Sequence, residues 1–169
     1  MKIFIIETLV LVVLFTVICL IMCSNVDEHL NWVALNYPPE VVEYLIGEGR
    51  IDIPKTLTRK EKMKKKLPIA IFFIIILSAI VWHINGCRTF FSAFITCFGI
   101  WTIVDWYDAL VLDCLWFCHS KKIRVSGTEH MDKAYKDYMF HIKGSAFGMI
   151  IGFVVSVLVG VVVVAASFL

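Results

Sequence analysis

Four long apolar stretches dominate this sequence and limit the folds that it can adopt. They cover residues 3–23, 67–84, 90–117 and 142–169, in a chain that is 60% hydrophobic and only 18% charged. A soluble core of this size cannot bury so much apolar surface, whereas a bilayer needs about 20 apolar residues per helix. The sequence therefore predicts an all-α, polytopic membrane protein, a transmembrane four-helix bundle that forms a single membrane domain over residues 1–169.

Two polar loops, residues 24–66 and 118–141, separate these stretches, and each is short for an independent domain. In the first loop, Pro38-Pro39-Glu40 before an apolar pattern that ends at Gly47 predicts a short amphipathic helix. In the second, Thr128 is expected to be the N-cap of a helix that continues with little break into the last stretch. The tight turn at Asn85-Gly86 predicts that the second and third stretches are antiparallel neighbours.

Basic residues indicate how the chain crosses the membrane. The segment Lys55–Lys66 holds seven Lys or Arg residues and one acid, and the second loop is also basic. Because cytoplasmic loops are enriched in Lys and Arg, we expect a multi-pass protein of the cell membrane with cytoplasmic loops and both termini outside. The Lys-rich run either marks topology alone or also binds anionic lipid headgroups, through Lys60, Lys62, Lys64, Lys65 and Lys66. The net charge of +2 gives no reason to expect a nucleic-acid partner.

The last apolar stretch places a small residue at every fourth position. Positions four apart lie on one face of a helix, so these residues form a single stripe. Close backbone approach over small residues is a main source of attraction between membrane helices. The stripe predicts a close helix–helix contact, either within the chain or as a seam between copies in a homo-oligomer. Its members are Gly144, Gly148, Gly152, Ser156 and Gly160.

The third apolar stretch carries Asp105, Asp108 and Asp113. An ionisable group at the centre of a span costs at least about 2.5–3.5 kcal/mol and indicates function by default. If the span begins near Phe90 on the outer side, the three acids line the inner third of the bilayer and its interface. Helical spacing directs them toward one side, where two close carboxylates would share a proton or a cation.

The second loop and the start of the last stretch bring further polar groups to the same face of the membrane. Carboxylate, imidazole and phenol groups at one depth are suited to cation binding, to proton relay or to acid–base chemistry. These candidates are Glu129, Tyr135, Asp137, Tyr138 and His141. The alternative is structural, since Asp108 and Asp113 could pair with basic residues of the loop, namely Lys121, Lys122, Arg124 or Lys143.

The motifs DWYDALVLDCLWF and GTEHMDKAYKDYMFHIKG, with NYPPEV in the first loop, resemble a family of small four-span bacterial membrane proteins of uncharacterised function. The likeness is concentrated in residues 105–144. It implies the four-span architecture and directs attention to the same acids, tyrosines and histidine, but it implies no reaction. The family usually has Pro before Gly127, so Ser126 is expected to loosen that turn slightly.

Three functions are compatible with this pattern. The first is a small transporter or channel that uses the acidic face for a cation or proton. The second is an enzyme of the inner leaflet, in which Asp113, Glu129 and His141 bind a metal or act as acid and base. The third is a non-catalytic partner or sensor subunit of a membrane complex that docks through the first loop. The sequence has no nucleotide-binding loop, nucleophile elbow or HExxH motif, and it indicates no cofactor.

Overall fold

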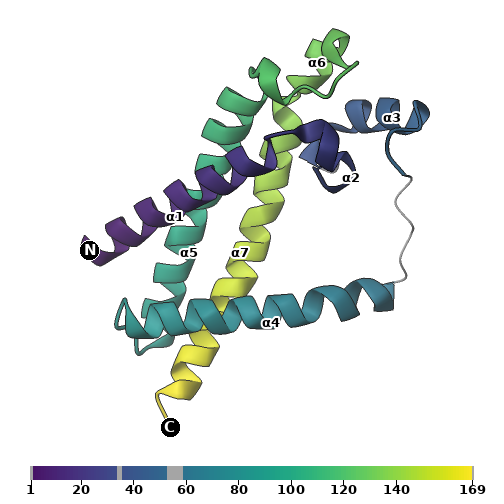
Figure 1. Ribbon diagram of the computed structural model, residues 1–169. Helices are drawn as coiled ribbons and strands as arrows, with labels where there is room; N and C mark the ends of the chain where they lie inside the picture. Colours follow the sequence, from purple (N-terminus) through teal and green to yellow (C-terminus); the bar gives the residue numbers. More distant parts are fainter. Residues whose placement is uncertain (1, 34–35, 53–58, 169) are drawn as a thin grey trace. The chain divides into compact units, whose positions relative to one another are not determined.

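The computed structural model describes residues 2–33, 36–52 and 59–168. Every regular element in these residues is a helix, as predicted (Figure 1). The side chains of residues 32, 59–66 and 69 lie outside what the structure describes, and this includes the predicted lipid-headgroup set, Lys60, Lys62, Lys64, Lys65 and Lys66.

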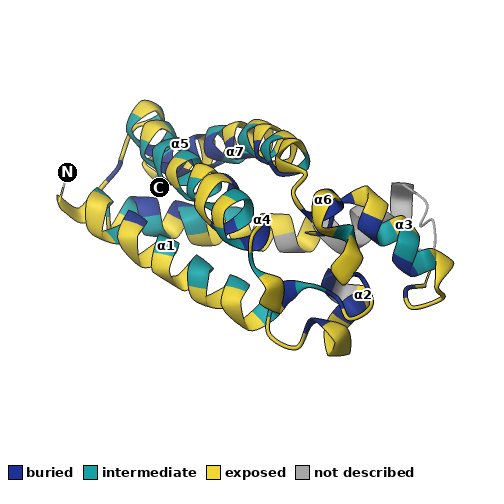
Figure 2. Cartoon of the chain, turned by 90° about the horizontal axis from the view of Figure 1, so that it is seen from above, coloured by how far each residue is buried: buried dark blue, intermediate teal, exposed yellow. Residues whose placement is uncertain are grey.

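Three of the long helices are long and apolar enough to cross a membrane. They are α1 (Lys2–Met22), the continuous helix Phe90–Phe117, and α7 (Tyr138–Ala166). Their outward side chains are apolar, and Ile21, Leu115 and Phe147 are each more than 60% exposed (Figure 2). A membrane protein is therefore supported. The fourth predicted span falls in α4 (Arg59–His83), whose described apolar part, Ala70–His83, is shorter than a span, so four spans remain a prediction.

Short helices occupy the two loops. In the first loop, the predicted amphipathic helix is α3 (Pro39–Gly47), which begins with proline in its first turn and buries Val41 and Leu45. It ends because Gly49 adopts a left-handed backbone, φ 68°, which glycine adopts without strain. The remaining short elements are η1 (Val26–His29), α2 (Leu30–Val33), η4 (Lys121–Ile123), η5 (Glu129–Met131) and α6 (Asp132–Tyr135).

The expected continuous helix from Thr128 into the last span is wrong in two respects. The Thr128 hydroxyl does not cap η5, because it donates to the carbonyl oxygen of Val125 at 2.7 Å. The chain also breaks after α6, and Asp137 starts a new helix by accepting the N–H of Phe140 at 3.1 Å. A carboxylate in this position satisfies a free N–H and suits the positive end of the helix dipole.

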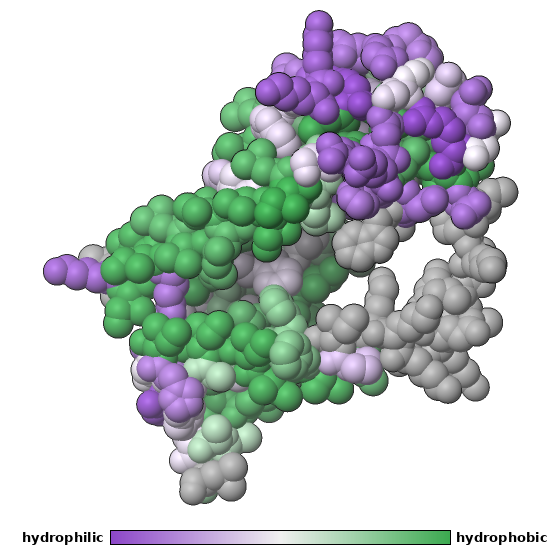
Figure 3. All heavy atoms as spheres, viewed as in Figure 1, coloured by the Kyte–Doolittle hydropathy of each residue, from purple (hydrophilic) through white to green (hydrophobic). Residues whose placement is uncertain are grey.

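The chain forms two compact units. The first contains residues 1–10, 55–105 and 147–169, and the second contains residues 11–54 and 106–146. The first unit has a core built from α4, α5 (Phe90–Tyr107) and α7, including Val81, Ala93 and Val159. The core of the second unit joins both polar loops. In Figure 3, hydrophilic residues gather over these loops, whereas hydrophobic residues cover the long helices.

In the first unit, α4 and α5 are neighbours joined by the turn at Gly86, where φ is 68°. They are not antiparallel as predicted, because α4 lies across α5 instead of alongside it (Figure 1). Short turns join helices that cross steeply as well as helices that lie side by side, so the length of the turn alone did not determine the packing.

The glycine stripe of α7 faces α5 of the same chain at three positions. A Cβ at Gly148 would clash with the Asp105 carboxylate, one at Gly152 with the Trp101 indole, and one at Gly160 would lie 2.8 Å from the Phe90 ring. The Trp101 Nε1–H also donates to the carbonyl oxygen of Gly148 at 3.1 Å. Ser156 is fully buried, whereas a Cβ at Gly144 would meet no described atom within 4 Å.

Beyond Tyr107 the third long helix changes its winding. Residues Asp108–Phe117 form the π-helix η3, and the N–H of Cys118 bonds to the carbonyl oxygen of Asp113, five residues back, at 2.9 Å. The 3.6-residue geometry on which the expected shared face of the three acids rested therefore ends before Asp108. Such insertions into α-helices are frequent at functional sites.

Candidate functional site

The second unit contains an acid–imidazole pair at the start of α7. His141 Nδ1 lies 3.0 Å from Asp113 Oδ2. The His141 side chain is 3% exposed and that of Asp113 is 30% exposed, so the pair joins a buried group to a partly accessible one. The two residues come from η3 and α7, segments that are separated in the sequence by the whole second loop.

Local structure fixes the position of the imidazole. Asp137 starts α7, so His141 lies about one turn into that helix. The Phe117 and Phe140 rings pack against it at centroid distances of 5.3 and 5.1 Å. An ionised carboxylate can only accept hydrogen bonds, so the Nδ1–H of His141 is the donor and Asp113 Oδ2 is the acceptor.

The other ring nitrogen of His141 has no hydrogen-bond partner. Nε2 is buried, and among the described residues no donor or acceptor bonds to it. Most buried polar atoms in proteins are satisfied, so an exception calls for an explanation such as a proton-transfer role or an ordered water. An imidazole held by a carboxylate at Nδ1 and unbonded at Nε2 can accept and release a proton.

The other two acids of the third long helix occupy different surroundings. Asp105 belongs to the first unit, where its carboxylate lies against Gly148. Asp108 is the first residue of η3 in the second unit and is half-buried. The expected pairing of Asp113 with a basic loop residue is not seen in the described chain, because Asp113 pairs with His141, and Arg124 pairs with Asp132 at 3.2 Å.

The remaining candidates have structural partners. Tyr135 is fully buried, accepts the N–H of Val125 at 3.1 Å and bonds the Thr128 hydroxyl at 2.6 Å. The Tyr138 hydroxyl bonds His119 Nε2 at 3.2 Å. Glu129 accepts the N–H of Gly127 at 3.0 Å. Its pKa is lowered by the N–H of its own residue and then by that of Gly127.

No three His, Cys, Asp or Glu side chains in the described residues lie close enough to hold a metal ion. The set of Asp113, Glu129 and His141 that the sequence suggested as metal ligands is therefore not assembled. The chemistry that the arrangement supports is proton exchange by the Asp113–His141 pair.

Sequence reasoning missed a polar cluster that ties the two loops together. Asp27 pairs with Arg50 at 2.9 Å, and it accepts the N–H of Ser126 at 3.2 Å and the Ser126 hydroxyl. Arg50 also donates to the Ser126 carbonyl oxygen. Nothing in the sequence marks Asp27, Arg50 and Ser126 as partners, because they lie far apart along the chain.

Asp27 should make the second unit sensitive to acid. The hydrogen bonds from Ser126, followed by Arg50, lower the pKa of Asp27. A lowered folded-state pKa contributes stability above the unfolded value of about 3.9, and this stability is lost as the pH falls through the folded-state value. We expect the free energy of unfolding in detergent to fall less between pH 5 and pH 3 in Asp27→Asn than in the wild type.

Glu28→Gln is the matched control for this measurement. It removes the neighbouring carboxylate, whose side chain makes no hydrogen bond within the described residues. An acid response of Asp27→Asn identical to that of the wild type would show that the cluster does not stabilise the loops.

The chain matches no protein-family model, no curated protein and no solved structure.

Proposed function

We propose that this protein is a small multi-spanning transporter or channel that passes protons through the Asp113–His141 pair. The observation that carries the proposal is the buried imidazole, 3.0 Å from a partly exposed carboxylate, with Nε2 unbonded. Asp113 is partly exposed and can exchange a proton with the surroundings, and His141 can exchange one through its unbonded Nε2, so the pair provides two successive proton sites.

The proposed topology is four spans with both termini outside and both loops cytoplasmic. Support comes from the three helices that are long enough to cross a membrane and from the basic residues of the two loops. In this orientation the pair lies at the inner side of the bilayer, close to the cytoplasmic loops. Groups at this interface can exchange protons with water on the cytoplasmic side.

A proton fits the site better than a metal cation does. The pair offers one carboxylate and one imidazole, and no third ligand of the usual types joins them in the described chain. Hard cations such as Mg²⁺ and Ca²⁺ take six or more ligands, mostly oxygens. A proton needs only one acceptor at a time.

Proton flux into liposomes tests this proposal. The full chain is reconstituted with a pH-sensitive dye inside, and a potassium diffusion potential drives proton entry. We expect flux above that of empty liposomes, and a reduction of at least about tenfold in Asp113→Asn and in His141→Asn. Asparagine at position 141 keeps an N–H donor near the place of Nδ1 but cannot exchange a proton.

Asp132→Asn is the control, because it removes a carboxylate of the second unit that pairs with Arg124 and Lys136 instead of with an imidazole. Its flux should equal that of the wild type. Wild-type flux no greater than that of empty liposomes, or unchanged flux in both Asp113→Asn and His141→Asn, would refute the proposal.

A further inference from the structure

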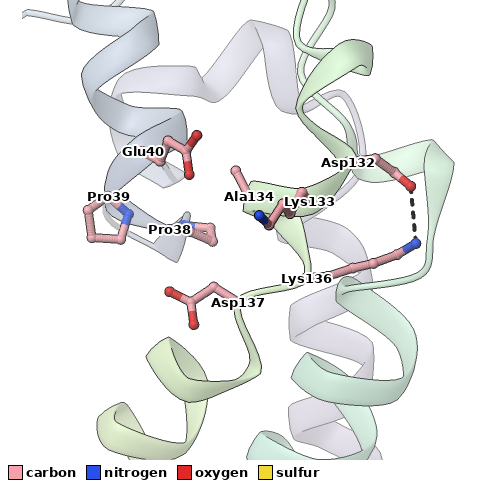
Figure 4. A pocket seen from close by; sticks show the side chains of 8 residues that line it. All are labelled: Pro38, Pro39, Glu40, Asp132, Lys133, Ala134, Lys136 and Asp137. Atoms are coloured by element: carbon pink, nitrogen blue, oxygen red, sulfur yellow. Dashed lines mark hydrogen bonds and ion pairs between the residues drawn. The ribbon is translucent and has the colours of Figure 1, made fainter.

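The second unit contains an open groove next to the start of α7 (Figure 4). Its volume is about 780 Å³. Pro38, Pro39 and Glu40 form one wall, at the beginning of α3. The other wall is formed by Asp132, Lys133, Ala134, Lys136 and Asp137. In Figure 4, the Pro38 ring faces the segment that carries Lys133 and Ala134, whereas the Pro39 ring points away from it. The groove thus combines an apolar wall with charged groups of both signs.

Within the described residues, not all of these charges have an oppositely charged partner. Asp132 pairs with Lys136 at 3.1 Å and with Arg124 at 3.2 Å. Glu40 and Lys133 form no ion pair with any described residue. Asp137 uses one carboxylate oxygen to accept the N–H of Phe140 and is likewise without a cationic partner in the described chain. The carboxylates of Glu40 and Asp137 and the ammonium group of Lys133 are exposed and can therefore contact a ligand.

The groove lies near the N-terminal end of α7, and this end would be at the level of the lipid headgroups if α7 spans the membrane. Asp137 directly precedes α7, and the last charged residue of that helix is Lys143. Six residues of helix rise about 9 Å, and the polar layer on each side of a bilayer is about 5–8 Å thick. If α7 spans the membrane, the groove opens at the level of the headgroups or just outside it.

We propose that this groove binds the headgroup of a phospholipid that carries a primary amine, as in phosphatidylethanolamine. The ammonium group has three N–H donors, which Glu40 and Asp137 can accept, and the phosphate lies next to Lys133. The quaternary ammonium of a choline headgroup has no N–H donor and satisfies the carboxylates less well. The site is separate from the Asp113–His141 pair and does not depend on proton transport.

Lipid binding to the full chain in detergent tests the proposal. The protein is titrated with phosphatidylethanolamine or phosphatidylcholine of the same acyl chains in mixed micelles, and bound lipid is counted by native mass spectrometry. We expect phosphatidylethanolamine to bind at least about fivefold more tightly. Glu40→Gln should weaken its binding about fivefold and that of phosphatidylcholine less, because only the primary amine has N–H donors for the carboxylate. Lys133→Gln should weaken the binding of both lipids about fivefold, because both carry the phosphate.

Glu43→Gln and Lys122→Gln are the matched controls, since they remove the same charges from exposed positions that do not line the groove. Equal affinity for the two lipids, or equal affinities in the groove variants and the controls, would overturn the proposal. Soluble phosphoethanolamine provides a further arm. Binding as tight as that of the lipid would show that the ligand is a free phosphate ester and overturn the assignment to a membrane lipid.

Discussion

Leucine in place of Gly152 should destabilise the protein by about 3 kcal/mol, because it forces the first unit to separate α5 from α7. A Cβ at position 152 would clash with the indole ring of Trp101. That ring cannot rotate away cheaply, since its Nε1–H donates to the carbonyl oxygen of Gly148 at 3.1 Å and it forms a T-shaped pair with Phe73 at a centroid distance of 6.3 Å. The free energy of unfolding in detergent, measured with a denaturant series, gives the size of the loss.

Gly144→Leu is the matched control, because it adds the same side chain to the same stripe. A Cβ at Gly144 meets no described atom within 4 Å, so the expected change is below about 0.5 kcal/mol. Equal losses at the two positions would show that the contact with Trp101 does not determine the packing. Loss of a homo-oligomer without loss of stability in Gly152→Leu would instead indicate a seam between copies.

The stripe illustrates what the sequence could predict about the fold. Glycines four apart predict a close helix–helix contact because the spacing alone places them on one face. The partner helix could not be predicted, because Asp105, Trp101 and Phe90 carry no pattern that marks them as facing glycine. Apolar length predicted α1 and the helix Phe90–Phe117 closely, but α4 begins at Arg59 and α7 at Tyr138, before the predicted starts at residues 67 and 142. The crossing of α4 over α5 depends on tertiary packing.

The π-helix over Asp108–Phe117 could not be read from the sequence. Its residues are ordinary for an apolar helix, and the choice between bonds to the fourth and the fifth residue depends on the surrounding structure. The expectation that Asp105, Asp108 and Asp113 form one face rested on uniform winding. It does not apply beyond Tyr107.

The sequence could place the members of the candidate site near one another but could not predict their pairing. Asp113 and His141 were expected at the same level, and the structure joins them at 3.0 Å, whereas their depth in a membrane stays a prediction. Arg124 was one of the basic residues expected to pair with Asp108 or Asp113. Its side chain is only 6% exposed, and its guanidinium group lies 3.9 Å above the Tyr135 ring. The residues on either side, Ile123 and Val125, are buried in the core of the second unit, so the Arg124 side chain lies against that core as well.

Tyr135 shows most clearly how a residue proposed for chemistry can be structural. It is fully buried, and Tyr37 and Phe117 pack around it at centroid distances of 5.8 and 6.4 Å. Removing a buried aromatic ring leaves a cavity, so Tyr135→Ala should lower the free energy of unfolding by about 4 kcal/mol. Tyr135→Phe keeps the ring but deprives the Val125 N–H of its partner, for a loss of about 1–3 kcal/mol.

Tyr138 is the control for both substitutions, because it lies three residues away and is 40% exposed, and because its hydroxyl bonds the exposed His119 and no other described residue. Tyr138→Ala and Tyr138→Phe should each change stability by less than about 1 kcal/mol. Denaturation in detergent, followed by helix content, provides the comparison. Losses at position 135 no greater than those at position 138 would show that the joint core of the two loops does not hold the second unit together, and Tyr135 would again be a candidate for the chemistry that its sequence position suggested.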